Sequence, residues 1–471
     1  MYENTTIAAI ASGLTDSGIG IIRISGENAI EAGDNLFRSP SGNRILKNVE
    51  SHTLHYGYII ENDIVIDEVM AVVMKGPRSF TGEDTVEIQC HGGPFVMKRI
   101  LNAVLGSGVK LAAPGEFTKR AFLNGRIDLS RAEAVMDIIR SQNEYALHSS
   151  LNQLKGSLEK KIRDFRDEII YEIAFIESAL DDPEHISLEG YTGKLDHKLE
   201  ILLDGIGKLL STADDGRLIQ EGVNTVIVGK PNVGKSSLMN FLTEEESAIV
   251  TEVAGTTRDA LRETVIINGI NFNIVDTAGI RHTEDTVEKI GVERAKKLAQ
   301  DADLILYVID GSVSLDESDR NILSGLKDKK VIILLNKSDL SGVVTKEDVL
   351  DLFREVLPER VSAGKEPVIL NISIKNGEGT EEFKNSVSEM FHHGEISVNS
   401  EIVITNVRHK EALQEAYDSL KLVRESIAGE LPEDFYSIDL MNAYASLGRI
   451  IGEEVDDDLV DEIFSKFCMG K

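Results

Sequence analysis

The chain reads Val-Ile-Val-Gly-Lys-Pro-Asn-Val-Gly-Lys-Ser-Ser over residues 226–237. This stretch has the form G-x-x-x-x-G-K-[ST], and it lies between an apolar β-branched run and a run typical of a helix. The glycines allow backbone N–H groups to approach phosphate oxygens, while Lys235 can reach the β- and γ-phosphates and Ser236 can bind Mg²⁺. The stretch therefore predicts a strand, a phosphate-binding loop and a helix, and with them a nucleoside triphosphate site.

Length and composition limit the class of protein. A chain of 471 residues is too long for a single core, so we expect about two to four domains. The net charge of −30 argues against a general nucleic-acid coat, because phosphate neutralisation needs Lys and Arg. Two distant cysteines fit a reducing compartment. The sequence shows neither a signal peptide nor an uncharged run of about 20 residues, so we expect a soluble, cytoplasmic protein.

The N-terminal part, residues 1–118, contains segments with a strand pattern and segments with a helix pattern, which predicts an α+β domain. Expected strands lie at 18–25, 65–74 and 85–89, and expected helices at 29–37 and 96–105.

A helical period follows in residues 119–221. Apolar residues recur at steps of three and four from Leu151 to Ile173, which predicts one long amphipathic helix that ends at Asp181-Asp182-Pro183. A second helix is expected over 194–213. Residues 386–471 are again helical, and we expect them to pack on the earlier helices. The two parts would form one discontinuous all-α domain that carries an insertion.

The insertion, residues 222–385, alternates strands with helices. Apolar strands are expected at 225–228, 261–267, 271–275, 304–310, 331–336 and 367–372. The pair Asn268-Gly269 is a hairpin signal between the second and third strands. Apolar strands with crossover helices predict a largely parallel sheet covered by helices, that is, an α/β P-loop domain.

Three later segments decide which nucleotide is bound, and each follows an apolar strand. Asp276-Thr277-Ala278-Gly279 suits a metal-side carboxylate and a glycine at the γ-phosphate. In Asn336-Lys337-Ser338-Asp339 the last carboxylate can accept from N1–H and the exocyclic amine of guanine, a donor pair that adenine lacks. Ser373-Ile374-Lys375 can support the base. The order of these segments predicts GTP.

The segment between the loop and the hairpin, Gly255-Thr256-Thr257-Arg258-Asp259, is placed as a first switch, with Thr257 as the second Mg²⁺ ligand. Ile280 stands where Ras-type enzymes carry a water-orienting Gln, so another group must orient the water. Glu288 is a candidate; the alternative is that it belongs to the solvated start of an acidic helix.

Several motifs carry a resemblance to a known family. Asn232, the 255–259 switch and Ile280 resemble the potassium-activated GTPases of the translation-factor class. The segments 18–26, 81–93 and 114–125, together with the final Phe-Cys-Met-Gly-Lys over 467–471, resemble the bacterial tRNA modification GTPase MnmE (TrmE) family. The similarity covers essentially the whole chain, and the glycine-rich N-terminal segments and the tail are its most specific parts.

The resemblance implies an N-terminal domain with a folate-binding fold that also makes a homodimer, a helical middle and an inserted G domain. It implies joint action with the flavoprotein MnmG (GidA), in a heterotetramer or larger complex, at C5 of the wobble uridine of certain tRNAs. The product would carry a (carboxymethyl)aminomethyl-type group, with the one-carbon unit taken from 5-formyl- or 5,10-methylenetetrahydrofolate. The tRNA would be held mainly by the partner.

The resemblance also assigns roles to single residues. Glu288 falls on the water-positioning glutamate, and potassium would be bound by Asn232, Thr251, the Val253 carbonyl and Thr256. Mg²⁺ would be bound by Ser236 and Thr257. The GTP-binding residues would be Asn232, Val233, Gly234, Lys235, Ser236, Ser237, Thr251, Thr256, Thr257, Asp276, Thr277, Ala278, Gly279, Asn336, Lys337, Asp339, Ser373, Ile374 and Lys375. The folate-binding residues would be Arg23, Glu87, Arg126 and Lys471.

Several residues allow two interpretations, and so does the function. Without the resemblance, Arg23 and Glu87 read as surface charges of strands. Cys468 is either a thiol near the modification chemistry or part of a tail tucked into a helical core. Cys90 reads as a small buried residue rather than a metal ligand. A ribosome-assembly GTPase is the alternative function, and a scaffold whose nucleotide site only gates assembly is a third.

Overall fold

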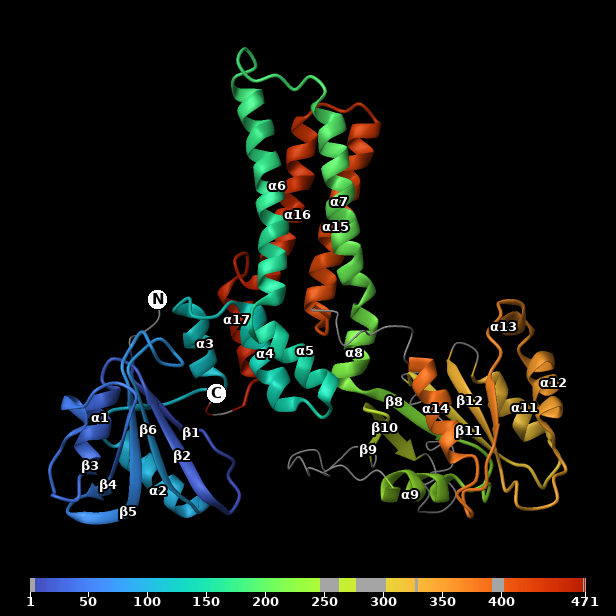
Figure 1. The fold of residues 1–471 in the computed structure, drawn as a ribbon, viewed down its shortest axis with the longest axis horizontal. Helices are drawn as coiled ribbons and strands as arrows, with labels where there is room; N and C mark the ends of the chain where they lie inside the picture. Colours follow the sequence, from blue (N-terminus) through green and yellow to red (C-terminus); the bar gives the residue numbers. More distant parts are fainter. Residues whose placement is uncertain are drawn as a thin grey trace. The chain divides into compact units, whose positions relative to one another are not determined.

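The computed structural model describes residues 5–245, 262–276, 302–326, 329–391, 402–468 and 470. The chain forms two compact units (Figure 1). The first unit comprises Met1–Arg140, Ser150–Gly207 and Glu411–Lys471, and the second comprises Ser141–Ser149 and Lys208–Lys410. Each unit is therefore assembled from segments that are far apart in the sequence.

The first unit contains a sheet of seven strands in the order β3-β4-β5-β6-β2-β1-β7. All neighbouring strands are antiparallel except β1 and β7, which are parallel. The strands are β1 (Ile7–Ile10), β2 (Ser17–Ser25), β3 (Phe37–Arg38), β4 (Thr53–Glu61), β5 (Ile64–Met74), β6 (Thr85–Gly92) and β7 (Lys110–Leu111). The accompanying helices are α1 (Ala29–Leu36), a 3₁₀ turn (Leu46–Asn48), α2 (Pro94–Leu105) and α3 (Glu116–Leu123).

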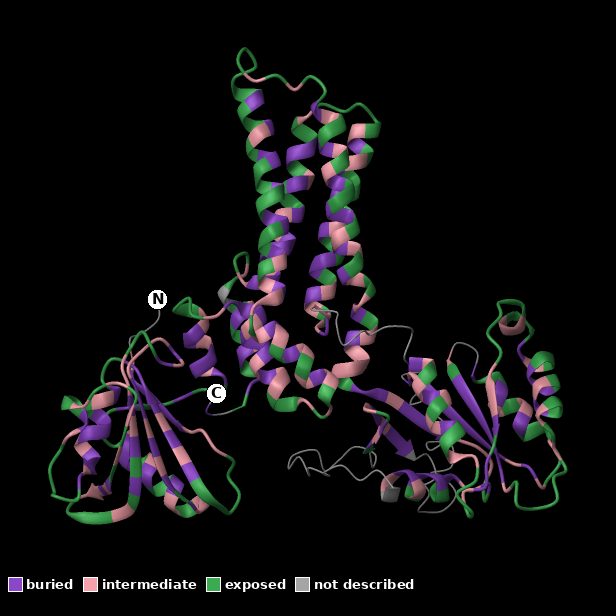
Figure 2. Cartoon of the chain, in the orientation of Figure 1, coloured by how far each residue is buried: buried purple, intermediate pink, exposed green. Residues whose placement is uncertain are grey.

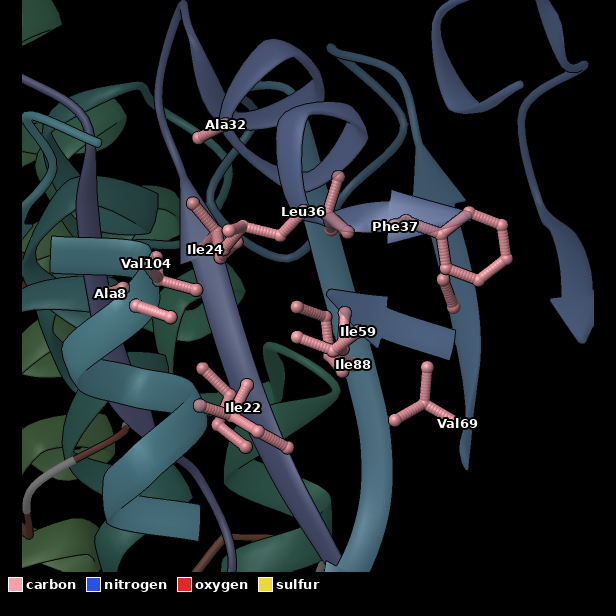
Figure 3. Packing of buried hydrophobic residues seen from close by; sticks show 14 of the residues in the cluster. Ala8, Ile22, Ile24, Ala32, Leu36, Phe37, Ile59, Val69, Ile88 and Val104 are labelled. Atoms are coloured by element: carbon pink, nitrogen blue, oxygen red, sulfur yellow. The ribbon is translucent and has the colours of Figure 1, made fainter. Parts of the chain in front are cut away.

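Alternating apolar residues on the central strands form the core of this sheet. Ile22 and Ile24 of β2 and Ile88 of β6 are buried, and Figure 3 shows them facing residues of α1 and α2 such as Leu36 and Val104. The alternation puts every second residue on the opposite face. Arg23 and Glu87 lie on that other face, and they are direct partners in the register of β2 and β6.

A helical bundle completes the first unit. C-terminal α16 packs along α6, as the sequence predicted for the last segment of the chain. The helices here and at the boundary with the second unit are α4 (Leu129–Arg140), α5 (Glu144–Leu154), α6 (Ser157–Asp181), α7 (Tyr191–Ser211), α8 (Ala213–Glu221), α15 (Val407–Ala428), α16 (Asp434–Ile451) and α17 (Asp457–Ser465). Figure 2 shows buried and exposed residues alternating along them.

One prediction in this region was wrong. The apolar period from Leu151 to Ile173 does not belong to a single helix, because α5 ends at Leu154 and α6 begins at Ser157. Gly156 separates the two helices with φ +90°, in the left-handed region where glycine is favoured. The period continues across the break, which is why periodicity alone missed it. The predicted end of α6 at 181–183 was correct.

The second unit contains a six-stranded sheet in the order β13-β12-β11-β8-β10-β9. All pairs are parallel except the β9–β10 hairpin, in which Asn268 and Gly269 both have positive φ as a type I′ turn requires. The strands are β8 (Val223–Val228), β9 (Arg262–Ile267), β10 (Ile270–Asp276), β11 (Leu304–Asp310), β12 (Lys330–Asn336) and β13 (Val368–Asn371). The helices are α9 (Lys235–Glu245), α11 (Glu317–Ser324), α12 (Lys346–Val356), α13 (Pro358–Ser362) and α14 (Thr380–Phe391).

The parallel α/β fold predicted for the insertion is confirmed, with an apolar layer on each face of the sheet. The order of strands reverses at β8, because β10 and β11 both pair with it. In open parallel sheets ligands bind at the carboxyl ends of strands beside such a switch point. Within the described part of the chain, no helix is both long enough and apolar enough to cross a membrane.

Candidate functional site

The loop between β8 and α9 starts and ends with glycines that other residues could not replace. Gly229 has φ +152°, and a Cβ atom there would lie 2.4 Å from the carbonyl oxygen of Val308. Gly234 has φ +106°, and a Cβ atom there would lie 2.3 Å from Nδ2 of Asn336. Both approaches are closer than any side chain allows, so glycine is needed for conformation and for space.

Lys235, the first residue of α9, folds back over this loop. Its Nζ donates to the carbonyl oxygens of Gly229 (2.9 Å) and Lys230 (2.6 Å), and its side chain is largely buried. The ammonium group thus lies in the concave face of the loop, beside the N-terminus of a helix. Both features attract an anion.

The start of the loop is fixed to helix α11 through Lys230, which the sequence reading had missed. Its Nζ donates to carboxylates of Asp316 (3.0 Å) and Asp319 (2.7 Å). Asp319 is fully buried and also accepts from the hydroxyl of Tyr307 at 2.7 Å. Burial alone would lower the pKa of Lys230, but the two carboxylates outweigh it and the pKa is raised. Only the acidic residues at the start of α11 could have signalled this anchor.

Asn336, at the end of β12, joins the loop to the segment after β13. Its Nδ2 donates to the carbonyl oxygen of Val233 (2.8 Å), and its Oδ1 accepts from the backbone N–H of Ile374 (3.2 Å). The side chain is buried, so these bonds are protected from water. One amide thereby connects two of the segments that the sequence had assigned to a single pocket.

The neighbouring residues complete this edge of the sheet. Ser373 is buried and donates through its hydroxyl to Oδ1 of Asp339 at 2.8 Å, which orients an otherwise exposed carboxylate. Lys337 has φ +66°, and its Nζ donates to Oδ2 of Asp310 at 2.6 Å. Burial raises the pKa of Asp310, but hydrogen bonds from Lys337 and Ser312 outweigh this effect and leave it lowered.

Some of the remaining predicted residues of this site are described by the structure, and the others lie outside the described residues. Asn232 (φ +64°), Ser236 and Ser237 lie at the loop and the first turn of α9 with exposed side chains, and Lys375 is exposed after β13. Asp276 ends β10 opposite Ile227 of β8; only its backbone is described. Outside the described residues lie Thr251, Val253, Thr256, Thr257, Thr277, Ala278, Gly279 and Glu288.

A second cluster lies on the face of the N-terminal sheet opposite the core of Figure 3. Arg23 Nε donates to Oε1 of Glu87 at 2.8 Å, and both side chains are mostly buried. The guanidinium group of Arg23 lies 5.5 Å from the ring centroids of both Phe80 and Phe117. The pair is therefore neither an edge-strand nor a solvated surface charge. It is held between aromatic rings, which strengthen the binding of a cation.

The C-terminal tail reaches this cluster. Arg23 donates to the carbonyl oxygen of Gly470 at 3.3 Å, and the backbone N–H of Gly115 donates to the carbonyl oxygen of Cys468 at 3.3 Å. Gly470 has φ +84°, and a Cβ atom there would lie 2.3 Å from the carbonyl oxygen of Ile10. The tail is thus seated on the N-terminal domain with the thiol of Cys468 exposed. Lys471 lies outside the described residues.

Arg126 belongs to the same cluster. Its guanidinium carbon lies 5.7 Å from the ring centroid of Phe80, and it donates to the carbonyl oxygen of Ser79. The two rings were missed at the sequence level, although Phe117 lies inside a motif that carries the family resemblance. From sequence alone, an aromatic residue in such a motif is interpreted as part of the hydrophobic core. Phe117 is indeed a core residue, with 0 % exposure, and its ring also contacts Arg23.

A partly buried ionic network joins the segments that carry Phe80 and Phe117. Arg120 donates to both carboxylate oxygens of Glu83 (3.2 Å each) and to Glu116 (2.8 Å). Glu83 also accepts from the hydroxyl of Ser25 at 2.8 Å, and that hydroxyl bonds Thr81. The network ties the end of β2 and the loop of residues 79–84 to α3, so it fixes the positions of Phe80 and Phe117.

The two cysteines differ in environment. Cys90 is buried in β6, where burial and the negative charge of Asp67 raise its pKa to about 11. Both thiols are free. The reading of Cys90 as a small buried residue is confirmed. Among the described residues, no group of three or more His, Cys, Asp and Glu side chains is arranged to hold a metal ion.

Two family models match the chain. The model described as the MnmE helical domain matches residues 129–468, and the model described as the GTP-binding protein TrmE N-terminus matches residues 6–126. Together they account for almost the entire chain, including both parts of the helical region.

Full-length relatives carry one shared name. The tRNA modification GTPase MnmE of Lachnoclostridium phytofermentans is 53 % identical over 469 residues, and that of Clostridioides difficile is 48 % identical over 472 residues. Each comparison covers 100 % of both chains. A crystal structure of Aquifex aeolicus Era bound to GDP·AlF4⁻ is 29 % identical and covers 42 % of this chain and 67 % of that chain. Its TM-score of 0.28 is too low to support a structural argument.

Proposed function

The chain belongs to the MnmE (TrmE) family of tRNA modification GTPases, and we propose from this premise that its GTPase cycle drives modification of the wobble uridine of certain tRNAs. The coarse function, GTP hydrolysis linked to tRNA modification, follows from full-length relatives of that name.

The GTP site would lie at the carboxyl ends of β8, β12 and β13. The observation that supports this assignment is the pair of hydrogen bonds made by Asn336, because they join the phosphate loop to the segment after β13 that we assign to base selection. Lys235 would then leave its two carbonyl partners for the phosphates. Asp339, oriented by Ser373, would select guanine by accepting from the N1–H and the exocyclic amine of the base.

The bound ions would be held by oxygen ligands, in keeping with the preferences of Mg²⁺ and K⁺. The Ser236 hydroxyl is exposed at the first turn of α9, and the Asn232 amide is exposed in the loop, so both can take up a ligand role. We propose Ser236 and Thr257 for Mg²⁺, and Asn232, Thr251, the Val253 carbonyl and Thr256 for K⁺. Both ions would neutralise phosphate charge, and Glu288 would position the attacking water.

The Arg23–Glu87 cluster would bind a tetrahydrofolate derivative that supplies the one-carbon unit. The donor set fits such a molecule, since Arg23, Arg126 and Lys471 offer cations for carboxylates and Glu87 offers a carboxylate for the donor edge of a pterin-like ring. The rings of Phe80 and Phe117 give the site apolar walls. Cys468, exposed on the tail beside this site, would lie near the modification chemistry.

The protein would work as a homodimer through its N-terminal domain, together with the flavoprotein MnmG in the cytoplasm. The net charge of −30 supports a division of labour in which the partner holds most of the tRNA. We place the domain borders at 1–118, 119–221, 222–385 and 386–471. A ribosome-assembly role is disfavoured, because the two family models cover both the N-terminal and the helical regions.

The test of this function is nucleoside analysis of bulk tRNA from cells that lack the protein. We expect loss of the (carboxymethyl)aminomethyl group at C5 of the wobble uridine, restored by the wild-type chain. An unchanged nucleoside profile would refute the proposal. In purified protein, replacing Na⁺ by K⁺ should accelerate hydrolysis of GTP, and equal rates in the two salts would remove potassium from it.

A further inference from the structure

The phosphate loop is tied to helix α11 through its second residue, Lys230, and the tie ends on the buried carboxylate of Asp319. We propose that Asp319 is a positioning residue for the nucleotide, because through Lys230 it holds the loop in the shape that receives phosphates and so slows the release of bound GDP. The inference rests on the GTP site proposed above and adds to it a residue outside its sequence motifs.

Asp319 lies in the first turn of α11 and has 0 % exposure. One carboxylate oxygen, Oδ1, accepts from the hydroxyl of Tyr307 at 2.7 Å. The other, Oδ2, accepts from Nζ of Lys230 at 2.7 Å and from the backbone N–H of Asp316 at 2.9 Å. Burial and the hydrogen bond to Asp319 raise the pKa of Tyr307, so its hydroxyl remains a donor. A strand, the start of a helix and the phosphate loop therefore meet at one carboxylate.

Lys230 connects this carboxylate to the part of the loop that would receive phosphates. Its backbone carbonyl accepts from Nζ of Lys235 at 2.6 Å, while its own Nζ is bound to Asp319. The preceding residue, Gly229, lies so close to β11 that a Cβ atom there would be 2.4 Å from the carbonyl oxygen of Val308. The start of the loop is thus fixed twice, by its backbone on β11 and by a side chain on α11.

The other end of the loop has its own fixed point. Nδ2 of Asn336 donates to the carbonyl oxygen of Val233 at 2.8 Å, and Gly234 lies against the same amide group. Without the tie from Lys230, the loop would be held mainly at this second end, and its first residues could move relative to α9. A nucleotide would then have to order the loop on binding, which lowers affinity.

Helix capping alone does not explain this arrangement. Asp316 and Asp319 form a capping box at the start of α11. Such a box needs neither complete burial nor a cation from another segment. A buried ion pair is also a poor source of stability, because the cost of removing both charges from water offsets much of their attraction. We therefore explain the bond between Lys230 and Asp319 by its effect on the loop.

The position of Asp319 determines which kinetic constants it should affect. Asp319 acts through Lys230 and not on the reacting atoms. Its loss should therefore weaken the ground state and the transition state equally, which raises KM for GTP and leaves kcat unchanged. Because affinity changes within one site lie mostly in the dissociation rate, GDP should also leave faster.

The experiment measures the release of a fluorescent GDP analogue from the full-length chain, by stopped-flow displacement with excess GDP. Asp319→Asn keeps an acceptor for Tyr307 but presents an amide N–H to Lys230, and Lys230→Met removes the ammonium group. We expect each variant to release GDP about tenfold faster, as for a lost bond between charged groups. The matched control is Glu355→Gln, which breaks an exposed bond from Arg320 of the same helix (2.6 Å) and should change release by less than about twofold.

The double variant tests whether Asp319 acts through Lys230. Asp319→Asn combined with Lys230→Met should release GDP no faster than Lys230→Met alone, because two changes in one link are not additive. Lys230→Arg keeps a cation for Asp319 and should accelerate release by less than about threefold. A role only in the stability of α11 would lower the melting temperature of Asp319→Asn without changing release from the folded protein.

Three outcomes would overturn the proposal. The first is unchanged GDP release from Lys230→Met, which decides the matter even if Asp319→Asn does not fold. The second is additivity of the two substitutions in the double variant. The third is a fall in kcat for GTP with KM unchanged, which would place Asp319 in the chemical step. Failure of the wild-type chain to bind the GDP analogue would instead remove the proposed GTP site, and this inference with it.

Discussion

The phosphate loop and the Arg23 cluster are built in opposite ways. The loop with Lys235 comes from consecutive residues between one strand and one helix, and its glycines are fixed by contacts within a single sheet. The Arg23 cluster draws on β2, β6, the loop before β6, the start of α3 and the C-terminal tail. The first site is local in sequence, and the second exists only after the whole unit has folded.

This difference has consequences for mutation. Replacement of Lys235 in the phosphate loop should affect the chemistry of the nucleotide and little else. A change at Arg23 removes a partner of Glu87, a contact of the tail and two aromatic contacts at once. The second site should therefore couple ligand binding to stability, and the first should not.

The largest effect is expected for Lys235→Ala. Loss of a preorganised cation at the phosphates should lower GTP turnover by about 10²–10³-fold while thermal stability changes little. The exposed Lys365→Ala in the same unit serves as the control and should keep wild-type turnover. Steady-state phosphate release measures both, and a Lys235→Ala variant with normal turnover would contradict the assignment of this loop.

The next effect is expected for Asp339→Asn. Replacing the carboxylate by an amide removes an acceptor and adds a donor facing guanine, so GTP affinity should fall by about 100-fold, as for a lost bond to a charged group. Ser373→Ala removes only the hydrogen bond that orients Asp339 and leaves the carboxylate itself in place, so it should cost about fivefold. Titration with a fluorescent GDP analogue checks this ranking, and the reverse order would refute the assigned roles.

The Arg23 cluster should show the coupling that the loop lacks. Arg23→Ala leaves the mostly buried Glu87 without this partner, so it should destabilise the fold by about 1–3 kcal/mol and weaken tetrahydrofolate binding by about tenfold or more. Arg23→Lys keeps the charge and should lose less of both. Calorimetric unfolding and ligand titration are measured on the same samples. Loss of binding with unchanged stability would show that the two sites do not differ in this way.

The smallest effect concerns the thiols. The pKa of Cys90 is raised to about 11, so below that pH the thiol stays protonated and buried, and it should resist labelling at pH 8. Cys468 is exposed and should react first. In the native protein about one equivalent of thiol should therefore react rapidly with a thiol reagent, and the second thiol should react only in denaturant. Rapid labelling of both would contradict the burial of Cys90.

The sequence predicted the local site far better than the dispersed one. The G-x-x-x-x-G-K-S spacing and the apolar strands located β8, β11 and β12 within one or two residues, because these patterns are encoded in neighbouring residues. The roles of Phe80, Phe117 and the Gly470 carbonyl depend on contacts between distant segments, which no local pattern contains. The break at Gly156 was missed for a related reason, since one left-handed residue interrupts a helix without changing the apolar period.

We propose that the loop around Lys235 and the carboxylate of Asp339 form one guanine-nucleotide pocket. Calorimetric titration of the purified full-length chain with GDP and with ADP, in KCl and MgCl₂, tests it most directly. We expect saturable binding of GDP and binding of ADP at least about 100-fold weaker, because adenine lacks the two donor groups from which Asp339 accepts in guanine. Equal binding of the two nucleotides, or tighter binding of ADP, would contradict it.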